Sequence, residues 1–157
     1  MKEIVKPLMQ WYAKHARTLP WRSDPTPYHV WLSEIMLQQT RVEAVIGYYD
    51  RFLEELPDVQ SLAAVSEERL LKLWEGLGYY NRARNLQKAA VQICEQYQGK
   101  FPESYEEWLA LPGIGAYTAG AVTSIAFGKK EAAVDGNVYR IYTRLYADDT
   151  EISKTAF

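Results

Sequence analysis

Two carboxylic acids in this 157-residue sequence have surroundings that would set opposite protonation states. Glu34 lies in the largely apolar run 30–37, where loss of solvent would raise its pKa and keep it protonated near neutral pH. Asp135 precedes Gly136 at an expected helix start, where backbone donors and the helix dipole would lower its pKa. A protonated acid beside a charged carboxylate is the pair that cleaves a glycosidic bond through an oxocarbenium-like transition state.

Each carboxylate also has a purely structural interpretation. Glu34 could share a mixed, solvated helix face with Gln38 and Arg41. Asp135 could serve only as a helix N-cap, since Asp-Gly often precedes a helix for structural reasons. For either residue alone the structural interpretation is the stronger one, and only the pair favours catalysis. The sequence does not show that the two carboxylates converge in space.

A tight glycine-containing turn separates two expected helices at residues 111–115. Gly113 and Gly115 lie where the second helix begins, so no bulky side chain covers the backbone N–H groups there. Such amides, at the positive end of a helix dipole, can bind a nucleic-acid phosphate without reading sequence. The same Pro-Gly-x-Gly pattern also serves simply as a turn between helices. The local pattern supports both interpretations equally.

The segment 76–94 combines a glycine turn, tyrosines and a basic helix, and it contains no acidic residue. Tyr79 precedes Arg82 and Arg84, a combination that suits a nucleic-acid surface, because cations contact phosphates and an aromatic ring can fill a gap in a base stack. The structural alternative is a solvated basic face with tyrosines in the core. Gln39, at an expected helix junction, could fill a space in a duplex or be an exposed linker residue.

These residues would be held by an all-helical chain. Apolar residues recur every three or four positions, strand-like alternation is absent, and Pro or Gly separates the periodic runs. Residues 19–22 are expected to form a turn, and Thr40 and Glu43 fit a capping box that would start a new helix after a break at 38–39. Thr26 followed by Pro27 is typical of a helix start, and Ser104 with Glu107 fits a second capping box. The other expected helices cover about residues 3–15, 27–38, 59–64, 67–75, 79–97, 104–110, 116–127 and 136–146.

The composition excludes several classes of protein. The chain is 48% hydrophobic, with 18 basic and 20 acidic residues, as in one soluble globular domain. The net charge of -2 argues against a broadly basic nucleic-acid coat but not against a local basic face. A single cysteine, Cys94, excludes an internal disulfide or a thiolate metal site built from this chain alone. No apolar run reaches the roughly 18 residues of a membrane span and no signal peptide opens the chain, so we expect a cytoplasmic protein without membrane association.

Five segments resemble the MutY-type adenine DNA glycosylases of the helix-hairpin-helix superfamily. They are residues 19–22, 31–40, 76–86, 111–127 and 134–140, and they occur in the family's order. The resemblance implies an all-α fold in which a six-helix barrel spans about residues 18–128, with the helix-hairpin-helix at about 104–127. Residues 1–17 would then be the N-terminal helix of a second, incomplete helical lobe. Residues 129–157 would be the start of the return into that lobe.

The resemblance also implies an enzymatic activity and catalytic roles. Members of the family flip adenine mispaired with 8-oxoguanine or guanine out of the duplex and hydrolyse its N-glycosidic bond. Glu34 matches the acid that protonates adenine at N7, and Asp135 matches the carboxylate that stabilises the oxocarbenium ion. Tyr117 and Asn137 match residues that support this second carboxylate. Related bifunctional enzymes have a lysine nucleophile at the position of Tyr117, so this chain is expected to be a monofunctional glycosylase.

Further matches concern the DNA, the base pocket and bound ions. The residues expected to contact DNA are Gln39, Tyr79, Arg82, Arg84, Gly113, Gly115 and Thr118, and those expected beside the pocket are Arg17, Trp21, Arg22 and Leu37. Hairpins of this family can also hold a monovalent cation through backbone carbonyls. The expected partner is double-stranded DNA with an A:8-oxoguanine or A:G mismatch, bound by a monomer.

The match to the family stops at residue 157. Typical members continue with more helices, a C-x6-C-x2-C-x5-C motif for a 4Fe-4S cluster and a Nudix-like domain, none of which is in this sequence. We therefore expect a truncated chain whose first helix lacks packing partners along Ile4, Leu8, Trp11 and Tyr12. Two alternatives stay open. One is a catalytically incomplete DNA-binding fragment, and the other is a related mismatch glycosylase that removes thymine or uracil.

Overall fold

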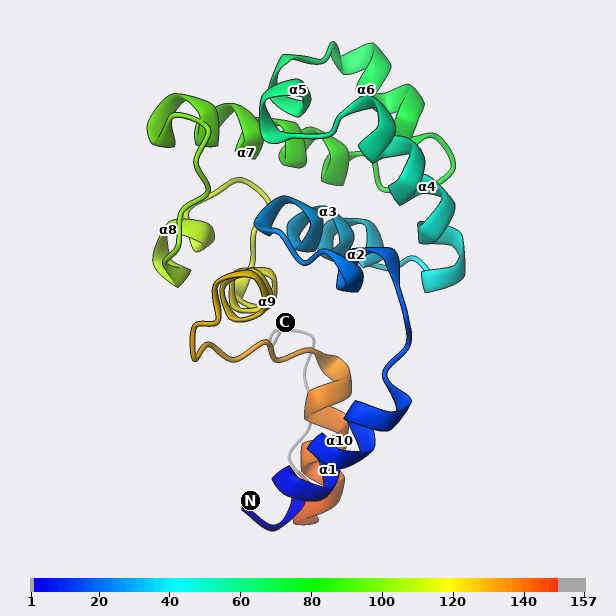
Figure 1. Cartoon of the computed structure of the whole chain (residues 1–157), viewed down its shortest axis with the longest axis vertical. Coiled ribbons are helices and arrows are strands. Elements are labelled where there is room, and N and C mark those ends of the chain that lie inside the picture. Colours follow the sequence, from blue (N-terminus) through cyan, green and yellow to red (C-terminus); the bar gives the residue numbers. More distant parts are fainter. Residues whose placement is uncertain (1, 150–157) are drawn as a thin grey trace.

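A computed structural model describes residues 2–149 of the chain, with side chains from residue 4 onward, and in this range it contains helices and no strand (Figure 1). The all-α fold class is therefore confirmed. The helices are α1 (Lys2–His15), α2 (Pro20–Ser23), α3 (Pro27–Leu37), α4 (Val42–Glu55), α5 (Val59–Ala64), α6 (Glu67–Trp74), α7 (Asn81–Tyr97), α8 (Tyr105–Leu109), α9 (Ala116–Phe127) and α10 (Gly136–Tyr146).

Helix α3 is the centre of the core. It packs against α2, α4, α7 and α9, and Figure 1 shows it between α7 and α9. Its fully buried Trp31 meets the ring of Trp108 edge-on at 5.7 Å between centroids, and Phe101 stacks on Trp108 at 5.9 Å. Aromatic side chains bury the largest apolar areas of any residues, so this cluster anchors α3 firmly. Side chains that leave α3 toward α9 therefore start from a helix whose position is fixed by the core.

Local sequence signals set several helix ends as expected. The Thr26 side chain accepts a hydrogen bond from the His29 N–H, and Pro27 begins α3. Ser104 and Glu107 form the expected capping box at the start of α8. Asp135 caps α10 through its side chain. These helix starts depend on residues within one turn, which is why sequence alone predicts them.

Three local predictions were wrong. Residues 19–22 do not form a simple turn, because Pro20 begins the short helix α2 and its Trp21 is buried. The expected capping box at Thr40 is absent: α4 begins behind Arg41, which makes no side-chain cap, and the Thr40 hydroxyl instead donates to the Gln38 carbonyl at 3.4 Å. Helix α7 begins two residues later than expected, because Tyr79 has a left-handed backbone with φ 48°.

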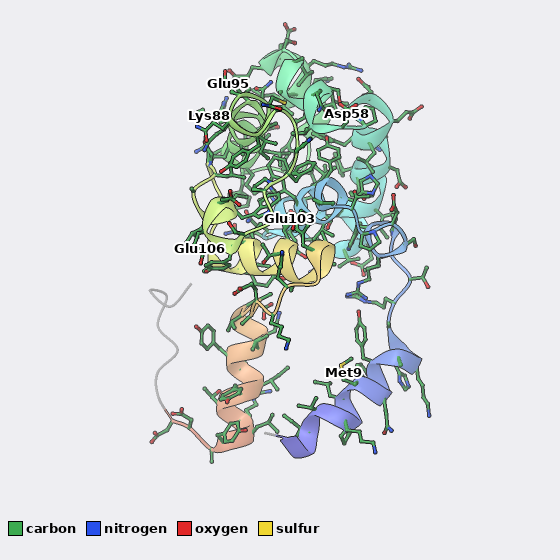
Figure 2. All side chains as sticks on the ribbon, turned by 60° about the vertical axis from the view of Figure 1, so that its left-hand side comes forward. Met9, Asp58, Lys88, Glu95, Glu103 and Glu106 are labelled. Carbon is green, nitrogen blue, oxygen red and sulfur yellow. The ribbon has the colours of Figure 1, made fainter. Side chains whose placement is uncertain are left out.

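Helices α1 and α10 pack differently from the rest. Figure 2 shows them extending away from the remaining helices, and α10 contains no buried residue. On α1, Leu8 and Trp11 are 57% and 55% exposed, as expected for a helix without a partner along that face. The division of the chain near residues 17 and 128 stays a prediction. In the described part of the chain, no helix is long and apolar enough to span a membrane.

Candidate active site

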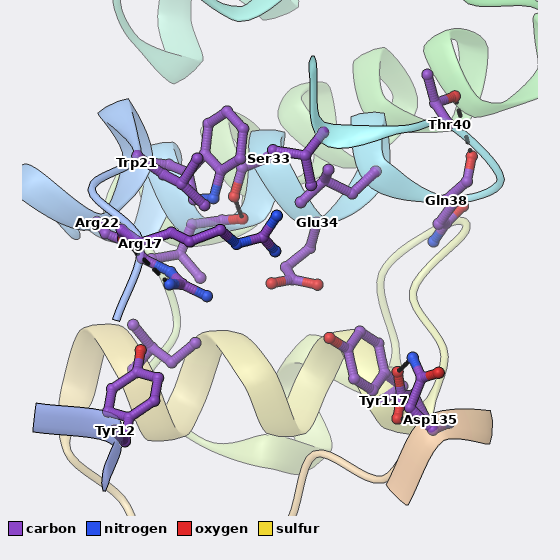
Figure 3. Close-up of a pocket in the computed structure, with 16 residues that line it drawn as sticks. Tyr12, Arg17, Trp21, Arg22, Ser33, Glu34, Gln38, Thr40, Tyr117 and Asp135 are labelled. Carbon is purple, nitrogen blue, oxygen red and sulfur yellow. Dashed lines mark hydrogen bonds between the residues drawn. The ribbon is translucent and has the colours of Figure 1, made fainter. Parts of the chain in front are cut away.

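A cavity of about 740 Å³ lies between α3 and α9 and reaches the start of α10 (Figure 3). Its volume is in the range of small-molecule binding sites in proteins. The residues that line it include eight of the positions singled out from the sequence, namely Arg17, Trp21, Arg22, Glu34, Leu37, Tyr117, Asp135 and Asn137. The structure therefore brings the expected catalytic and pocket residues to one place.

Glu34 extends from the core helix α3 into this cavity (Figure 3). Helix α3 ends at Leu37, so Gln38 and Arg41 do not continue a helix face with Glu34, and Glu34 itself is half-buried. The solvated-face interpretation of Glu34 therefore does not hold. Burial raises the pKa of the Glu34 carboxyl above its usual range. The Tyr117 hydroxyl and the positive charge of Arg22 act in the opposite direction but do not cancel this effect. Glu34 therefore holds its proton to higher pH than an ordinary glutamic acid.

Asp135 has the opposite environment at the start of α10. Its Oδ1 accepts the backbone N–H groups of Asn137 at 3.0 Å and Val138 at 2.8 Å. Its Oδ2 accepts the side-chain amide of Asn137 at 2.8 Å. Partial burial by itself would raise the pKa of Asp135, but these hydrogen bonds together lower it below the usual value. Asp135 is therefore a charged carboxylate at neutral pH, and Asn137 orients it.

Tyr117 links the two carboxylates from the first turn of α9. Figure 3 shows its side chain directed into the cavity, with Glu34 on one side and Asp135 on the other. Burial raises the pKa of the Tyr117 hydroxyl well above its usual value, and the charges of Glu34 and Asp135 add to the effect. The hydroxyl is therefore a neutral hydrogen-bond donor toward Glu34, and Asp135 acts on it only through its charge.

Gly120 on α9 is a residue that sequence analysis missed. A Cβ atom at Gly120 would lie 2.2 Å from the backbone oxygen of Ala132, which real Cβ atoms do not tolerate. The segment that leads to Asp135 therefore crosses α9 at a point where only glycine fits. Gly120 lies inside the helix α9, where glycine costs about 1 kcal/mol relative to alanine, so its presence there is the signal that could have indicated a packing constraint.

The arginine side of the cavity comes from the region around α2. The Arg22 guanidinium donates to the Arg17 carbonyl at 3.2 Å and lies 5.9 Å from the centroid of the Tyr12 ring. Trp21 is buried and meets Tyr49 edge-on at 5.3 Å. The cavity thus has a basic wall near Arg17 and Arg22 beside the apolar wall that Trp21 supports. Leu37 completes the lining at the end of α3.

The glycine turn before α9 leaves backbone amides accessible, as expected. Gly113 has φ 74°, and a Cβ there would meet Asn85 of α7 at 2.7 Å, so the turn lies directly against α7. Gly115 is the N-cap of α9 and has no side-chain cap. The first amides of α9 therefore point away from the helix without a capping side chain, as an anion site requires. The Thr118 side chain is buried, so its predicted DNA contact, which stays a prediction, would be made by its backbone.

The remaining expected DNA contacts are Gln39, Tyr79, Arg84 and Arg82, and they differ in how they meet solvent. Gln39 and Tyr79 are exposed and have left-handed backbones, with φ 58° and 48°. Arg84 donates to Glu67 at 2.7 Å, so a phosphate would have to displace that partner. The expectation that Arg82 reaches phosphate is not met, because its guanidinium is turned toward backbone carbonyls inside the fold. Its terminal nitrogens donate to oxygens from two loops, which leaves none aimed at solvent.

The residues of this chain do not fit an iron–sulfur cluster. Among the described residues there is no group of three or more His, Cys, Asp or Glu that could hold a metal ion. Cys94 is a half-buried free thiol 3.8 Å from the Val59 carbonyl, and one thiolate cannot supply the four that a 4Fe-4S cluster uses. A monovalent cation at the glycine turn stays a prediction.

Comparison with known proteins identifies the family. The family model described as "HhH-GPD superfamily base excision DNA repair protein" matches residues 32–157, and the chain belongs to this family. Proteins named adenine DNA glycosylase from Buchnera aphidicola subsp. Baizongia pistaciae and from Homo sapiens are each 45% identical to the chain, over 89% and 94% of its length. The chain spans 40% and 29% of these two relatives. The resemblance to adenine DNA glycosylases is thereby confirmed.

Solved structures show the same fold. A thermostable thymine-DNA glycosylase matches with a TM-score of 0.85 and 31% identity, over 90% of this chain and 66% of that one. A non-covalent Endonuclease III–DNA complex matches with a TM-score of 0.79 and 28% identity, over 95% of this chain and 72% of that one. These similarities confirm the predicted helix-hairpin-helix glycosylase architecture.

Proposed function

We propose that this chain forms the adenine-releasing site of a base excision repair DNA glycosylase that acts on adenine opposite 8-oxoguanine or guanine. One observation carries the proposal: a carboxyl group with a raised pKa, Glu34, shares a cavity with a charged carboxylate, Asp135. This pair suits acid-assisted departure of a base from a sugar. The base itself is proposed from the relatives, which are named adenine DNA glycosylases.

The proposed reaction begins when Glu34 gives its proton to N7 of an adenine flipped into the cavity. The bond between N9 and the sugar C1′ then breaks, its electron pair stays with the base, and neutral adenine leaves. Asp135 stabilises the positive charge that develops at the sugar. Water adds to C1′, and the proton that the water loses returns to the Glu34 carboxylate. Tyr117 offers a hydroxyl and no amine, so we propose no Schiff-base chemistry and a monofunctional enzyme.

The proposed partner is double-stranded DNA with an A:8-oxoguanine or A:G mismatch, bound by a single copy of the chain. The proposed location is the cytoplasm. The amides after Gly115 would hold a backbone phosphate, and Gln39 and Tyr79 would enter the duplex beside the flipped base. Two solved relatives in complex with DNA support a DNA-bound role for this fold. A monovalent cation at the turn before α9 belongs to the same proposal.

Single-turnover release of adenine from an A:8-oxoguanine duplex tests this function. We expect the unaltered chain to release adenine and Glu34→Gln to be slower by about 100-fold or more, because an amide cannot supply the proton. Glu43→Gln on α4 is the matched control, since Glu43 is exposed and outside the cavity. Equal rates for Glu34→Gln and Glu43→Gln would overturn the acid role. DNA binding without release by the unaltered chain would support the alternative of a binding fragment.

A second candidate function is removal of thymine from a mismatch. The observation that favours it is the TM-score of 0.85 with a thymine-DNA glycosylase. Release assays on G:T and G:U duplexes, run beside the A:8-oxoguanine duplex, separate the two functions. Thymine or uracil release that exceeds adenine release would replace the adenine proposal with this one.

A further inference from the structure

The two exposed residues Gln39 and Tyr79 lie in loops that are far apart in the sequence, after α3 and before α7. Both adopt the left-handed backbone conformation, with φ 58° and 48°. For residues other than glycine this conformation is uncommon and persists only when the surrounding structure maintains it. Something in the fold must therefore hold both loops in these conformations.

A single guanidinium, that of Arg82, contacts both loops. Its Nη1 donates to the carbonyls of Ile35, Met36 and Gln38 at 2.9, 3.0 and 2.5 Å. Its Nη2 donates to the carbonyls of Leu77 and Gly78 at 3.0 and 3.2 Å, and to the Thr40 hydroxyl at 3.4 Å. In the first set, Ile35 and Met36 belong to the last turn of α3 and Gln38 to the loop that carries Gln39. In the second set, Leu77 and Gly78 directly precede Tyr79, and Thr40 directly follows Gln39.

The Arg82 guanidinium lies beside the end of α3, where backbone carbonyls need hydrogen-bond donors. The last carbonyls of a helix have no partner within the helix, and a cation there also complements the helix dipole. The guanidinium carbon lies 5.4 Å from the Trp74 ring centroid and 5.7 Å from the Tyr79 ring centroid. Trp74 is fully buried, and its indole N–H donates to the Gly78 carbonyl at 3.1 Å. The loop that carries Tyr79 is therefore attached to the core.

We propose that Arg82 is a positioning residue that places Gln39 and Tyr79 relative to each other, so that both enter a mismatched duplex together. This inference rests on the proposed function, because it assumes that the two residues meet DNA. Arg82 then governs the preference for mismatched over matched DNA through the two loops and makes no phosphate contact itself. Arg84, in contrast, could contact a phosphate, because its ion pair with Glu67 is exposed to solvent and a phosphate could take the place of the Glu67 carboxylate.

Lysine cannot replace Arg82 in this arrangement. A guanidinium presents five N–H donors in a planar fork, whereas an ammonium group presents three donors around one atom. Arg82→Lys keeps the positive charge but loses the simultaneous contact with both loops. A phosphate-binding role would be largely rescued by lysine, and a positioning role would not. This difference separates the two roles experimentally.

The first test needs no DNA. Hydrogen exchange is measured at the amides of Thr40 and Leu77, which are bonded to the Leu37 and Trp74 carbonyls in the two loops. We expect Arg82→Lys to accelerate exchange at both amides by about tenfold or more, since several charge-assisted hydrogen bonds are lost. The matched control is Arg69→Met, which removes an exposed arginine paired with Glu55 and should leave both amides unchanged. Unchanged exchange in Arg82→Lys would overturn the proposal.

The second test measures binding to mismatched and matched duplexes by fluorescence anisotropy, with Glu34→Gln present so that no turnover occurs. We expect Arg82→Lys to lower the mismatch preference about tenfold, and to lower it by less than about twofold when Gln39→Ala and Tyr79→Ala are already present. An equal loss of affinity for both duplexes, or the same loss in the triple variant, would overturn the positioning role. Adenine release by the unaltered chain is scored separately and tests only the proposed function.

Discussion

Helices α3 and α10 each hold one of the two carboxylates, but they differ completely in burial. Seven of the eleven residues of α3 are buried, whereas none of the eleven residues of α10 is. Burial therefore raises the pKa of Glu34, whereas at Asp135 a smaller degree of burial is outweighed by hydrogen bonds from Val138 and Asn137, and the pKa falls. The contrast shows that burial by packed helices raises the pKa of Glu34, whereas the hydrogen bonds at the start of α10 lower the pKa of Asp135 against the effect of its own partial burial.

The same contrast extends to the hydrophobic surfaces of the chain. Around α3, Trp31, Trp74 and Trp108 are fully buried. On α10, Ile141 and Leu145 are 59% and 52% exposed, and α1 has a similar apolar face. The cavity lies where the densely packed helices meet these two sparsely packed ones. Substitutions in the densely packed helices should therefore lower stability much more than substitutions on α1 or α10.

The largest expected effect is on stability. Trp31→Ala should lower the free energy of unfolding by about 3–5 kcal/mol, because it opens a cavity among fully packed rings. Trp11→Ala, on the exposed face of α1, should change it by no more than about 0.5 kcal/mol. Urea denaturation followed by circular dichroism measures both values. Similar losses for the two variants would contradict the contrast between the core and α1.

The next largest effect is on the chemical step. Asp135→Asn should slow single-turnover adenine release by about 100- to 1000-fold, because a neutral amide does not stabilise the developing charge at the sugar. The fold should persist, since asparagine is also a good N-cap. Asp50→Asn on α4, an exposed position outside the cavity, is the control. A rate close to that of the control would remove Asp135 from the reaction.

The pH dependence of release should reflect both carboxylates. The active form has Glu34 protonated, so the rate should fall as pH rises through the raised pKa of Glu34, above the usual glutamate value of about 4.3. Asp135 must be ionised, so the acidic limb should lie below the usual aspartate value of about 3.9. Tyr117→Phe should move the upper limb to higher pH, since the Tyr117 hydroxyl lowers the pKa of Glu34. An upper limb that stays in place in Tyr117→Phe would argue against this interaction.

The smallest expected effect is a gain in stability. Because the pKa of Glu34 is raised in the folded chain, its charged form destabilises the fold once the pH rises through that pKa. Glu34→Gln removes this cost, so the variant should have a higher Tm than the unaltered chain at pH 7. The difference should disappear below about pH 4, where the carboxyl is protonated in both states. Glu43→Gln should show no such pH-dependent gain, and a lower Tm for Glu34→Gln at pH 7 would contradict the burial of Glu34.

Local features of the fold could be predicted where short-range chemistry decides them. The caps at Thr26, Ser104 and Asp135 were predicted from residues within one turn. The cap predicted at Thr40 is absent: α4 begins behind Arg41, and the Thr40 hydroxyl instead contacts the Gln38 carbonyl and the guanidinium of Arg82, 42 residues away. Arg82 itself was expected on a DNA surface for its charge alone. A cation in a basic segment does not reveal whether its partners are phosphates or carbonyls of its own chain.

The sequence by itself determined the all-helical class, the chemical types of the catalytic candidates and the glycine turn before α9. Only the tertiary structure decided that Glu34 is desolvated, that Asp135 reaches the same cavity and that Arg82 joins two loops. The close approach of residues 132–133 to Gly120 helps to bring Asp135 to the cavity, and it too is visible only in the packed chain. The physical reason is that helix formation and the cap at Asp135 depend on neighbours within a few residues, whereas solvent exclusion around Glu34 and the convergence of the two carboxylates depend on groups that only the packed chain brings together.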